Sequence, residues 1–337
     1  MTACLLEIKD LRTHFYTERG RVTAVDGITF KVEEGEIVGV VGESGCGKSV
    51  TSQSILKLYD ERLVEYEGEI NLKGRNLLPL SKSEMQKIRG NNISMIFQDP
   101  LSSLNPVYTI GYQITEAIML HRKVSKKEAY EKAIDMLRMT GIPTPEVRIH
   151  DYPHQLSGGM RQRVMIAMAL VCQPKLLIAD EPTTALDVTI QAQILDLIMQ
   201  MNQELNMGII LITHDLGVVA ETCTRVIIMY LGQIVEESDV ATLFAKPLHP
   251  YTKGLVKSIP KLEGDRTQKL YTIKGAVPSL NNIPIGCRFA PRCEYADELC
   301  ITKMPEIEHY QGSHKVRCWH YEKIAQGEEQ NYAATNQ

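Results

Sequence analysis

A glycine-rich turn near the start of the chain constrains the fold more strongly than any other feature. The segment GESGCGKS, residues 42–49, follows the apolar run EIVGVV and fits the pattern G-x-x-x-x-G-K-[ST] in full. Its glycines let backbone N–H groups turn inward around phosphate oxygens, and a helix beginning at Ser49 would point its positive end at the same oxygens. The segment therefore predicts a strand, a phosphate-binding loop and a helix, in that order.

Two side chains of this loop are expected to carry chemistry. Lys48 would bridge the β- and γ-phosphates of a nucleoside triphosphate, and the hydroxyl of Ser49 would ligate Mg²⁺. The residues expected to bind nucleotide in this segment are Gly42, Glu43, Ser44, Gly45, Cys46, Gly47, Lys48, Ser49 and Val50.

The later apolar runs indicate an α/β fold with a parallel sheet. The segments ISMIF, KLLIAD, GIILIT and RVIIMY are continuous rather than alternating, which is typical of strands covered on both faces. Ahead of them, LLEIKDLRTHF and VTAVDGITFKVEEGE predict antiparallel strands. Helical spacing within residues 100–155 predicts amphipathic helices, and hence a helical subdomain over about 99–157 inserted into the core.

The amino-acid composition of the chain changes after residue 240. Prolines recur there, and four of the eight cysteines lie beyond residue 280. We therefore expect a nucleotide-binding domain over residues 1–240 and a small C-terminal extension over residues 241–322. The last residues, 323–337, are polar, and we expect them to form a disordered tail.

Charge and hydropathy argue against several classes of protein. The net charge of −4 gives no basic signal for nucleic-acid binding. The longest apolar run, residues 164–172, is far shorter than the roughly 20 residues that a membrane-spanning helix needs. The first residues show no basic stretch followed by an apolar one, so we expect no signal peptide. A role at a membrane would therefore require other chains as anchors.

A pair of adjacent carboxylates completes the expected phosphate site. The segment LLIADE, residues 176–181, is an apolar run that ends in Asp180 and Glu181. The end of such a strand lies at the edge of the sheet where α/β proteins bind ligands. We expect Asp180 to hold Mg²⁺, directly or through water, and Glu181 to polarise the attacking water.

The segment LSGGMRQR, residues 156–163, gives a second anion-binding helix start in the same chain. Ser157 is the expected N-cap, and Gly158 and Gly159 expose backbone ahead of an apolar helix. At this point the sequence resembles the nucleotide-binding subunits of ABC (ATP-binding cassette) transporters, over residues 4–240. The resemblance matches Gln98 to the Q-loop, Asp187 in TALD to the D-loop, His214 to the switch histidine, and Phe15, or its neighbour Tyr16, to the aromatic that stacks on adenine.

The resemblance implies ATP hydrolysis between two cassettes paired head-to-tail. In that family the phosphate loop of one cassette faces the segment at 157–159 of the other, and ATP with Mg²⁺ lies between them. Binding of ATP closes the pair and hydrolysis reopens it. The implied catalytic residues are Glu181, His214 and Gln98; the implied Mg²⁺ ligands are Ser49, Gln98 and Asp180; and the implied nucleotide contacts of the second half are Ser157, Gly158, Gly159 and Asp187.

Two further segments resemble one subfamily, the peptide and nickel importers. QDPLSSLNP, residues 98–106, is similar to their segment after the Q-loop, and HPYTKGLVKSIP, residues 249–260, is similar to their C-terminal signature. The resemblance is to the D component of dipeptide and oligopeptide importers. It implies a second ATPase subunit, identical or different, two membrane permease subunits, an extracytoplasmic peptide-binding protein, and a peripheral place at the cytoplasmic face of the membrane.

Other functions remain as alternatives. An importer of nickel chelates or another solute would leave this subunit similar, because other subunits select the solute. Soluble ABC ATPases of translation usually carry two cassettes in one chain, whereas this chain has one. Those of DNA repair insert long coiled coils between the phosphate loop and the second helix start, an interval without sustained heptads here. Intact Glu181 and His214 argue against a redox-responsive protein that only senses nucleotide.

The four cysteines of the extension form a candidate metal site. They are Cys287, Cys293, Cys300 and Cys318, with five, six and seventeen residues between them. Structural zinc sites usually start from tighter C-x₂₋₄-C knuckles, whereas a four-iron, four-sulfur cluster takes Cys₄ ligation. Members of the resembled subfamily can carry such a cluster, so we expect 4Fe–4S, with zinc and unligated thiols or disulfides as alternatives. A mixed zinc site could use His309, His314 or His320, and Arg288 and Arg292 are expected to offset thiolate charge.

Overall fold

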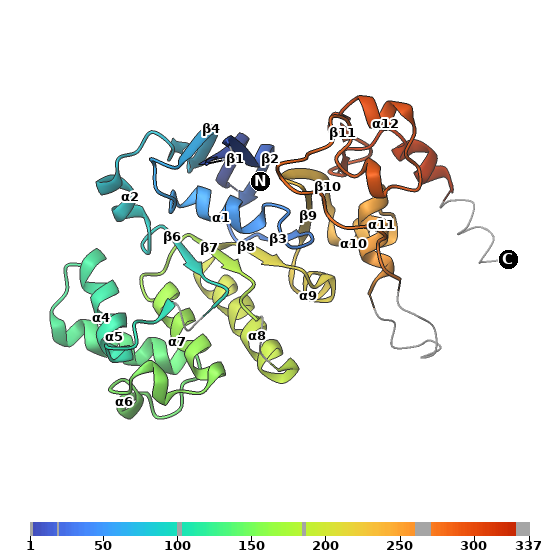
Figure 1. Ribbon diagram of the computed structural model, residues 1–337. Coiled ribbons are helices and arrows are strands. Elements are labelled where there is room, and N and C mark those ends of the chain that lie inside the picture. The colour runs from blue at the N-terminus through green and yellow to red at the C-terminus, as the bar shows by residue number, and fades with distance from the viewer. Residues whose placement is uncertain (1–2, 19, 100–102, 184–186, 260–270, 328–337) are drawn as a thin grey trace.

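The structure is a computed structural model whose strands form one small antiparallel sheet and one large mixed sheet (Figure 1). It describes residues 3–18, 20–99, 103–183, 187–259 and 271–327. The small sheet has the strand order β2-β1-β4-β5, and its long hairpin comes from the alternating segments near the N-terminus. Its strands are β1 (Cys4–Thr17), β2 (Gly20–Glu33), β4 (Val64–Leu72) and β5 (Arg75–Asn76).

The large sheet contains the expected parallel strands, in the order β11-β12-β10-β9-β3-β8-β7-β6. The five at its centre and one edge run parallel, and all residues of β3, β7 and β8 are buried. The parallel strands are β3 (Ile37–Val41), β6 (Ile93–Ile96), β7 (Leu176–Asp180), β8 (Gly208–Thr213) and β9 (Arg225–Tyr230). The continuous apolar runs therefore predicted these strands correctly.

Two hydrophobic clusters explain why these strands are apolar throughout. Val38 and Val40 of β3 pack toward the small sheet, whereas Ile37 and Val41 pack toward the helices. Because successive side chains point to opposite faces, a strand between two layers must be apolar at every position. The helices at this core are α1 (Lys48–Ile55), α2 (Lys82–Ile88), α7 (Gly158–Leu170), α8 (Val188–Leu205) and α9 (Leu216–Thr222).

A helical subdomain lies beside β6, as expected from the sequence (Figure 1). Helix α4 packs on α5, and both contact α7. Helix α5 ends at Met139 with Thr140 as its C-cap, and Gly141 follows with a φ of 73°, in the left-handed region that glycine tolerates. The elements are α4 (Ile110–His121), α5 (Lys126–Met139), α6 (Pro145–Arg148) and the 3₁₀ turn η1 (Pro153–Gln155).

The C-terminal extension continues the large sheet at the edge opposite the helical subdomain (Figure 1). Its strand β12 pairs antiparallel with β10, and β11 pairs with β12. The elements of this region are β10 (Gln233–Asp239), α10 (Val240–Ala245), α11 (Pro250–Lys257), the 3₁₀ turn η2 (Ala290–Arg292), α12 (Glu298–Thr302), β11 (Glu308–His309) and β12 (Lys315–Val316). The extension is thus joined to the nucleotide-binding core by strand pairing.

Part of the predicted disordered tail is helical instead. Residues 321–327 are helical, and the side chains of Ile324 and Ala325 are buried against a small cluster that includes Leu248. The assignment of residues 323–327 to a disordered tail is therefore wrong, because two apolar side chains give this segment a place to pack. Residues 328–337 lie outside the described part of the chain. Among the helices that the structure describes, none is long and apolar enough to cross a membrane.

Candidate active site

The phosphate loop lies between β3 and α1, where the sequence predicts it. Gly45 and Gly47 have φ angles of 80° and 102°, which residues with a Cβ rarely adopt. A Cβ on Gly42 would lie 2.3 Å from the carbonyl oxygen of Met229. No side chain caps the first turn of α1, which begins at Lys48, so its N–H groups point to the loop without a side-chain acceptor. Such groups suit a phosphate.

The buried ammonium of Lys48 folds back over the loop. Its Nζ donates to the carbonyl oxygens of Gly42, at 2.6 Å, and Glu43, at 3.1 Å. Cys46 lies beneath it, and burial raises the pKa of that thiol despite the nearby ammonium. Cys46 is therefore a small neutral packing residue of the loop, and Lys48 is the charge available to a phosphate.

The expected magnesium ligands meet between α1 and the end of β7. The hydroxyl of Ser49 donates to a carboxylate oxygen of Asp180 at 3.2 Å. Burial raises the pKa of Asp180, and the charge of Glu181 adds to that rise, while the hydrogen bond from Ser49 opposes it. A cation at this point would relieve the cost of burying that carboxylate, and hydroxyl and carboxylate oxygens are ligands that Mg²⁺ prefers.

Glu181 is held between two residues from distant parts of the sequence. The side-chain amide of Gln98 donates to one carboxylate oxygen at 2.9 Å, and Nδ1 of His214 lies 3.3 Å from the other. The φ of Glu181 is 48°, in the left-handed region, so the backbone leaves the extended path of the strand at this residue. The three residues implied as catalytic are therefore brought together at one edge of the sheet.

The second helix start lies on the surface. Ser157 caps α7 by accepting the N–H of Met160 at 3.3 Å, and both Ser157 and Gly158 are exposed. A Cβ on Gly158 would meet nothing within 4 Å, so this turn faces open space. Asp187 caps α8 by accepting the N–H of Ile190 at 3.0 Å. Residues 184–186 of TALD and 100–102 of QDPLSSLNP lie outside the described residues.

Phe15, rather than Tyr16, faces the expected place of a nucleotide base. Phe15 and Val50 line one hollow beside the phosphate loop. The ring of Phe15 is supported edge-on by Tyr59, with ring centroids 4.8 Å apart. The hydroxyl of Tyr16 instead donates to Glu65 at 2.6 Å. The alternation of side chains along β1 separates these two neighbours.

The C-terminal extension makes hydrogen bonds to the phosphate loop. The sequence did not predict this contact. Arg292 donates to both carboxylate oxygens of Glu43, at 2.6 and 3.0 Å, and this ion pair raises the pKa of the guanidinium. The backbone N–H of Glu43 donates to the hydroxyl of buried Tyr251 at 2.8 Å. The side chain of Glu43, expected to bind nucleotide, is thus used to hold the loop to the extension.

The two arginines make their hydrogen bonds with groups other than the thiols whose charge they could offset. Arg288 donates to Asp26 and to the carbonyl of Leu231, and Arg292 pairs with Glu43. Each finds a carboxylate of the nucleotide-binding core, which is a stronger partner for guanidinium than a protonated thiol.

The four cysteines of the extension converge. Burial raises the pKa of the Cys318 thiol to about 12, and the charges of Cys287, Cys293 and Cys300 add to that rise. Backbone N–H groups of Tyr295 and His320 donate to the sulfurs of Cys293 and Cys318, each at 3.4 Å. Backbone N–H groups directed at sulfur are typical surroundings for metal-bound thiolates.

The spacing of the sulfurs tests which metal fits. Among the described residues, no three of the four sulfurs lie within 4.8 Å of one another. A zinc ion with Zn–S bonds of about 2.3 Å would hold four sulfurs about 3.8 Å apart. Some of the four thiols would therefore have to move closer together to hold one zinc ion.

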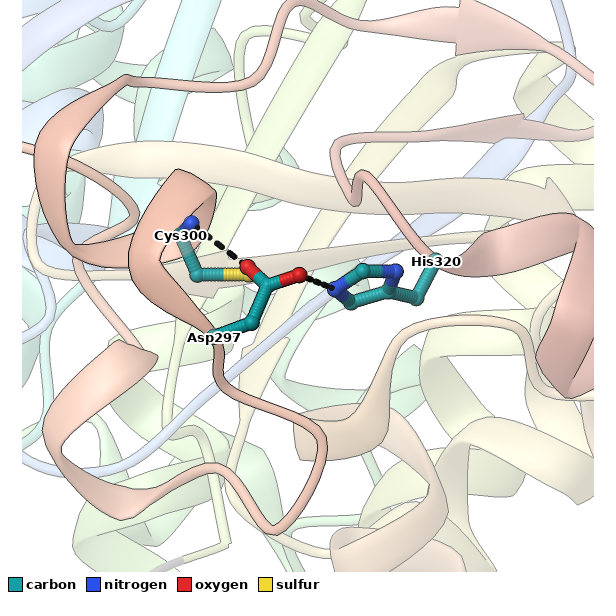
Figure 2. A group of neighbouring side chains, drawn as sticks. All are labelled: Asp297, Cys300 and His320. Atoms are coloured by element: carbon teal, nitrogen blue, oxygen red, sulfur yellow. Dashed lines mark hydrogen bonds and ion pairs between the residues drawn. The ribbon is translucent and has the colours of Figure 1, made fainter.

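One mixed group of ligand atoms does meet closely. Asp297, Cys300 and His320 each offer an atom within 4.8 Å of the others (Figure 2). Asp297 caps α12 by accepting the N–H of Cys300 at 3.0 Å, and His320 lies 3.1 Å from its other oxygen. These bonds explain the position of Asp297 without an ion. Of the other expected histidines, His314 pairs with buried Glu236 at 2.8 Å, and His309 is exposed on β11.

Two family models match the chain. One, described as "ABC transporter", matches residues 25–184, and one, described as "Oligopeptide/dipeptide transporter, C-terminal region", matches residues 235–300. The first includes the phosphate loop, Gln98 and Glu181, and the second includes the residues of the extension that contact the loop.

Curated relatives match almost the whole chain. A probable peptide ABC transporter ATP-binding protein, y4tR, of Sinorhizobium fredii is 54% identical over 95% of this chain and 96% of the relative. The oligopeptide transport ATP-binding protein AppD of Bacillus subtilis is 52% identical over 97% and 99%. The dipeptide transport ATP-binding protein DppD of Haemophilus influenzae is 48% identical over 93% and 94%.

Solved structures match the nucleotide-binding core. A dimeric structure of MJ0796, titled a bacterial ABC transporter cassette, has a TM-score of 0.63 and 28% identity, and covers 70% of this chain and 98% of that one. A second structure of MJ0796, with the same scores, is titled a dimeric post-hydrolysis state bound to ADP and Pi. The parallel-sheet cassette fold predicted from the sequence is confirmed.

Proposed function

From the premise that this chain belongs to the ABC transporter ATP-binding proteins of the oligopeptide and dipeptide type, we propose that it hydrolyses ATP to energise peptide import. One observation carries the catalytic part of the proposal. The carboxylate of Glu181 is fixed by Gln98 and His214 at the edge of the sheet where the phosphate loop also ends. Water placed against this carboxylate would be oriented for attack on a γ-phosphate.

The residues of the site have separate roles in this proposal. Lys48 binds the β- and γ-phosphates, and Glu181 accepts a hydrogen bond from the attacking water. His214 and Gln98 hold the carboxylate in place and sense whether the γ-phosphate is present. Mg²⁺ would be held by Ser49, Asp180 and Gln98, and it would neutralise charge on the phosphate oxygens.

ATP would join two cassettes. Ser157 and Gly158 are exposed, and Gly158 faces open space, so this turn is accessible to a phosphate held by another chain. We propose that the segment 157–159, with Asp187 nearby, completes the site of a second cassette, identical or different. The solved relatives titled as dimers support this arrangement. Closure with ATP and opening after hydrolysis would then drive the transporter.

The remaining partners follow from the same family membership. We propose two membrane permease subunits and an extracytoplasmic peptide-binding protein, with this chain peripheral at the cytoplasmic face. The helical subdomain would contact the permeases. The division into a core of residues 1–240 and an extension of residues 241–322 is part of this proposal, with the strand pair β10–β12 joining them.

We further propose that Cys287, Cys293, Cys300 and Cys318 hold a 4Fe–4S cluster. Four buried or half-buried thiols lie in one small part of the extension, and backbone N–H groups point at two of them. When bound, such a group would cross-link the loops of a short segment that has only a small hydrophobic cluster. Anaerobic purification should give iron and acid-labile sulfide in equal amounts, whereas stoichiometric zinc without sulfide would contradict the cluster.

The catalytic proposal is tested by Glu181→Gln in the complex with the partner cassette. The amide cannot polarise water as a carboxylate does, so ATP turnover should fall at least about 100-fold. Pairing of the two cassettes with ATP should persist in sedimentation. Glu221→Gln, an exposed glutamate of α9, is the matched control and should leave turnover unchanged. Full turnover in Glu181→Gln would reject the assignment.

A further inference from the structure

The hollow that contains Phe15 has a wall from the C-terminal extension. It has a volume of about 680 Å³, within the usual range for small-ligand sites. The residues that line it are Phe15, Thr17, Glu18, Val22, Ala24, Val50, Leu280 and Asn281. Only the last two come from beyond residue 240, and more than 200 residues of chain separate them from the others. The extension therefore reaches across the mouth of this hollow.

The chemistry of the hollow suits a flat, largely apolar group. An aromatic ring from β1 and the aliphatic side chains of Val22, Val50 and Leu280 form most of its lining. Val50 directly follows Ser49 of the phosphate loop, so the hollow continues from the phosphate site. A purine base attached through ribose to phosphates on that loop would enter here and stack on Phe15.

The segment that carries Leu280 and Asn281 is held in place. Leu280 packs against the main hydrophobic cluster. The N–H of Asn281 donates to the hydroxyl of Ser279 at 3.3 Å, and the N–H of Asn282 donates to the Ser279 carbonyl at 2.8 Å. This local turn presents the side chain of Asn281 at the edge of the hollow, where the described structure gives its amide no hydrogen bond.

Arg292 links this segment to the phosphate loop. Its guanidinium donates to the carbonyl oxygens of Lys274, at 3.0 Å, and Ile273, at 3.5 Å, as well as to the carboxylate of Glu43. One buried side chain therefore fixes the start of the segment relative to the loop that binds phosphate. The phosphate loop and the segment that leads to the wall thus share one side chain as a partner.

We propose that Leu280 and Asn281 form the outer wall of the base pocket, so that the C-terminal extension takes part in binding ATP and in choosing its base. This inference rests on the proposed function as an ATPase. Leu280 would contact the face or edge of the base opposite Phe15. Asn281 would read the purine edge, because an amide can accept from the N6 amino group of adenine and donate to N7, whereas guanine presents two acceptors there.

The test compares three ligands on the full chain with its partner cassette. ATP occupies both the base pocket and the phosphate loop, GTP tests the choice of base, and inorganic tripolyphosphate reaches the loop alone. Leu280→Ala should weaken ATP binding about fivefold, from the loss of partly buried apolar contact, and should leave tripolyphosphate binding unchanged. Asn281→Ala should reduce the preference for ATP over GTP about tenfold, the effect of losing one paired amide contact.

Matched controls come from the same segment. Asn282→Ala removes the next amide, and Ile285→Ala removes an exposed apolar side chain, neither of which lines the hollow. Both should bind all three ligands as the unaltered chain does. If Leu280→Ala and Asn281→Ala keep the original affinity and base preference, the proposal is wrong. It is also wrong if they weaken ATP and tripolyphosphate equally, because that result places their effect on the loop.

The outcome for the unaltered chain separates this inference from the proposed function. If that chain binds neither ATP nor tripolyphosphate, the proposed ATPase function fails and this inference fails with it. If it binds and hydrolyses ATP while the two variants behave like the controls, only the role of the extension is rejected.

Discussion

The nucleotide site and the four-thiol site of this chain are built in different ways. In the nucleotide site each charged side chain already has a hydrogen-bond partner. Lys48 donates to loop carbonyls, Asp180 accepts from Ser49, and Glu181 accepts from Gln98. In the thiol site the sulfurs converge without bonding one another, and burial raises their pKa values. The first site is organised by the parallel sheet, whereas the second is the site that we propose a metal cluster would organise.

Loss of the buried ammonium should give the largest effect and leave the thiol site intact. Lys48→Ala removes the positive charge that faces the phosphates, and we expect ATP affinity to fall roughly 100- to 1,000-fold, the scale of a lost charge-assisted contact in a preorganised site. Isothermal titration with ATP measures this. Metal content of the extension should not change, and a parallel loss of metal would show that the two sites are not independently built.

Removal of one thiol should affect the thiol site and largely spare the nucleotide site. Cys318→Ser should abolish bound iron and make the extension sensitive to protease, while ATP turnover per folded complex falls by less than about tenfold, because the sheet holds the catalytic residues without the metal. Metal analysis and limited proteolysis measure these effects. The control is Cys4→Ser, an exposed thiol of β1. Retained metal in Cys318→Ser would reject this cysteine as a ligand.

Loss of the ion pair between Arg292 and Glu43, which joins the two regions, should have an intermediate effect. Arg292→Ala leaves Glu43 without its partner, and we expect the KM for ATP to rise about tenfold with kcat little changed, since a hydrogen-bonded ion pair is worth about 1.5–3 kcal/mol. Glu43→Gln should do nearly the same, and the double variant should be no worse than either. Additive effects would mean that the two side chains act separately. Arg138→Ala removes an exposed ion pair of α5 as a control.

Acid should have the smallest of these effects, a loss in the free energy of unfolding that comes from His249. Burial lowers the pKa of His249 to about 3, and its Nδ1 accepts the N–H of Tyr251 at 3.1 Å. Below about pH 6.5 the unfolded chain therefore binds a proton at His249, whereas the folded chain binds one there only near pH 3. Stability is lost as pH falls from about 6.5 toward 3, at up to about 1.4 kcal/mol per unit from this group.

Urea unfolding at pH 7.0 and 5.5 measures that loss. His249→Asn keeps an acceptor for the Tyr251 N–H but does not titrate, so it should lose about 1 kcal/mol less than the unaltered chain over this interval. An identical pH dependence in both proteins would mean that His249 is not the group responsible.

Local motifs predicted where the phosphate loop and the two carboxylates after β7 lie, because each motif corresponds to a short backbone structure. The loop before Lys48 needs glycine where φ is positive, and Asp180 and Glu181 follow a buried strand whose end must lie at the sheet edge. Each of these features is encoded within a few consecutive residues, so a single sequence is enough to predict it. The strands and the helices of the inserted subdomain were found for the same reason.

The contacts of the extension were not predictable in this way. Arg292 and Glu43 are separated by 249 residues, and nothing in either segment indicates the other. Asp297 was missed as the cap of a five-residue helix, and the helix over residues 321–327 was hidden by polar composition. Such contacts depend on tertiary placement, which neither periodicity nor spacing encodes. The tyrosine of HPYT could have been suspected as a packing residue, but its partner could not.

The pairing of β12 with β10 has a consequence for biosynthesis. The chain leaves the ribosome from its N-terminus, so β10 emerges long before residues 315–316 can occupy its open edge. Cys318 follows only two residues later. Until then β10 offers unpaired backbone groups to any neighbouring polypeptide, and the last thiol has yet to be made. Closure of this edge and completion of the four-thiol set are therefore among the last events as the chain is made.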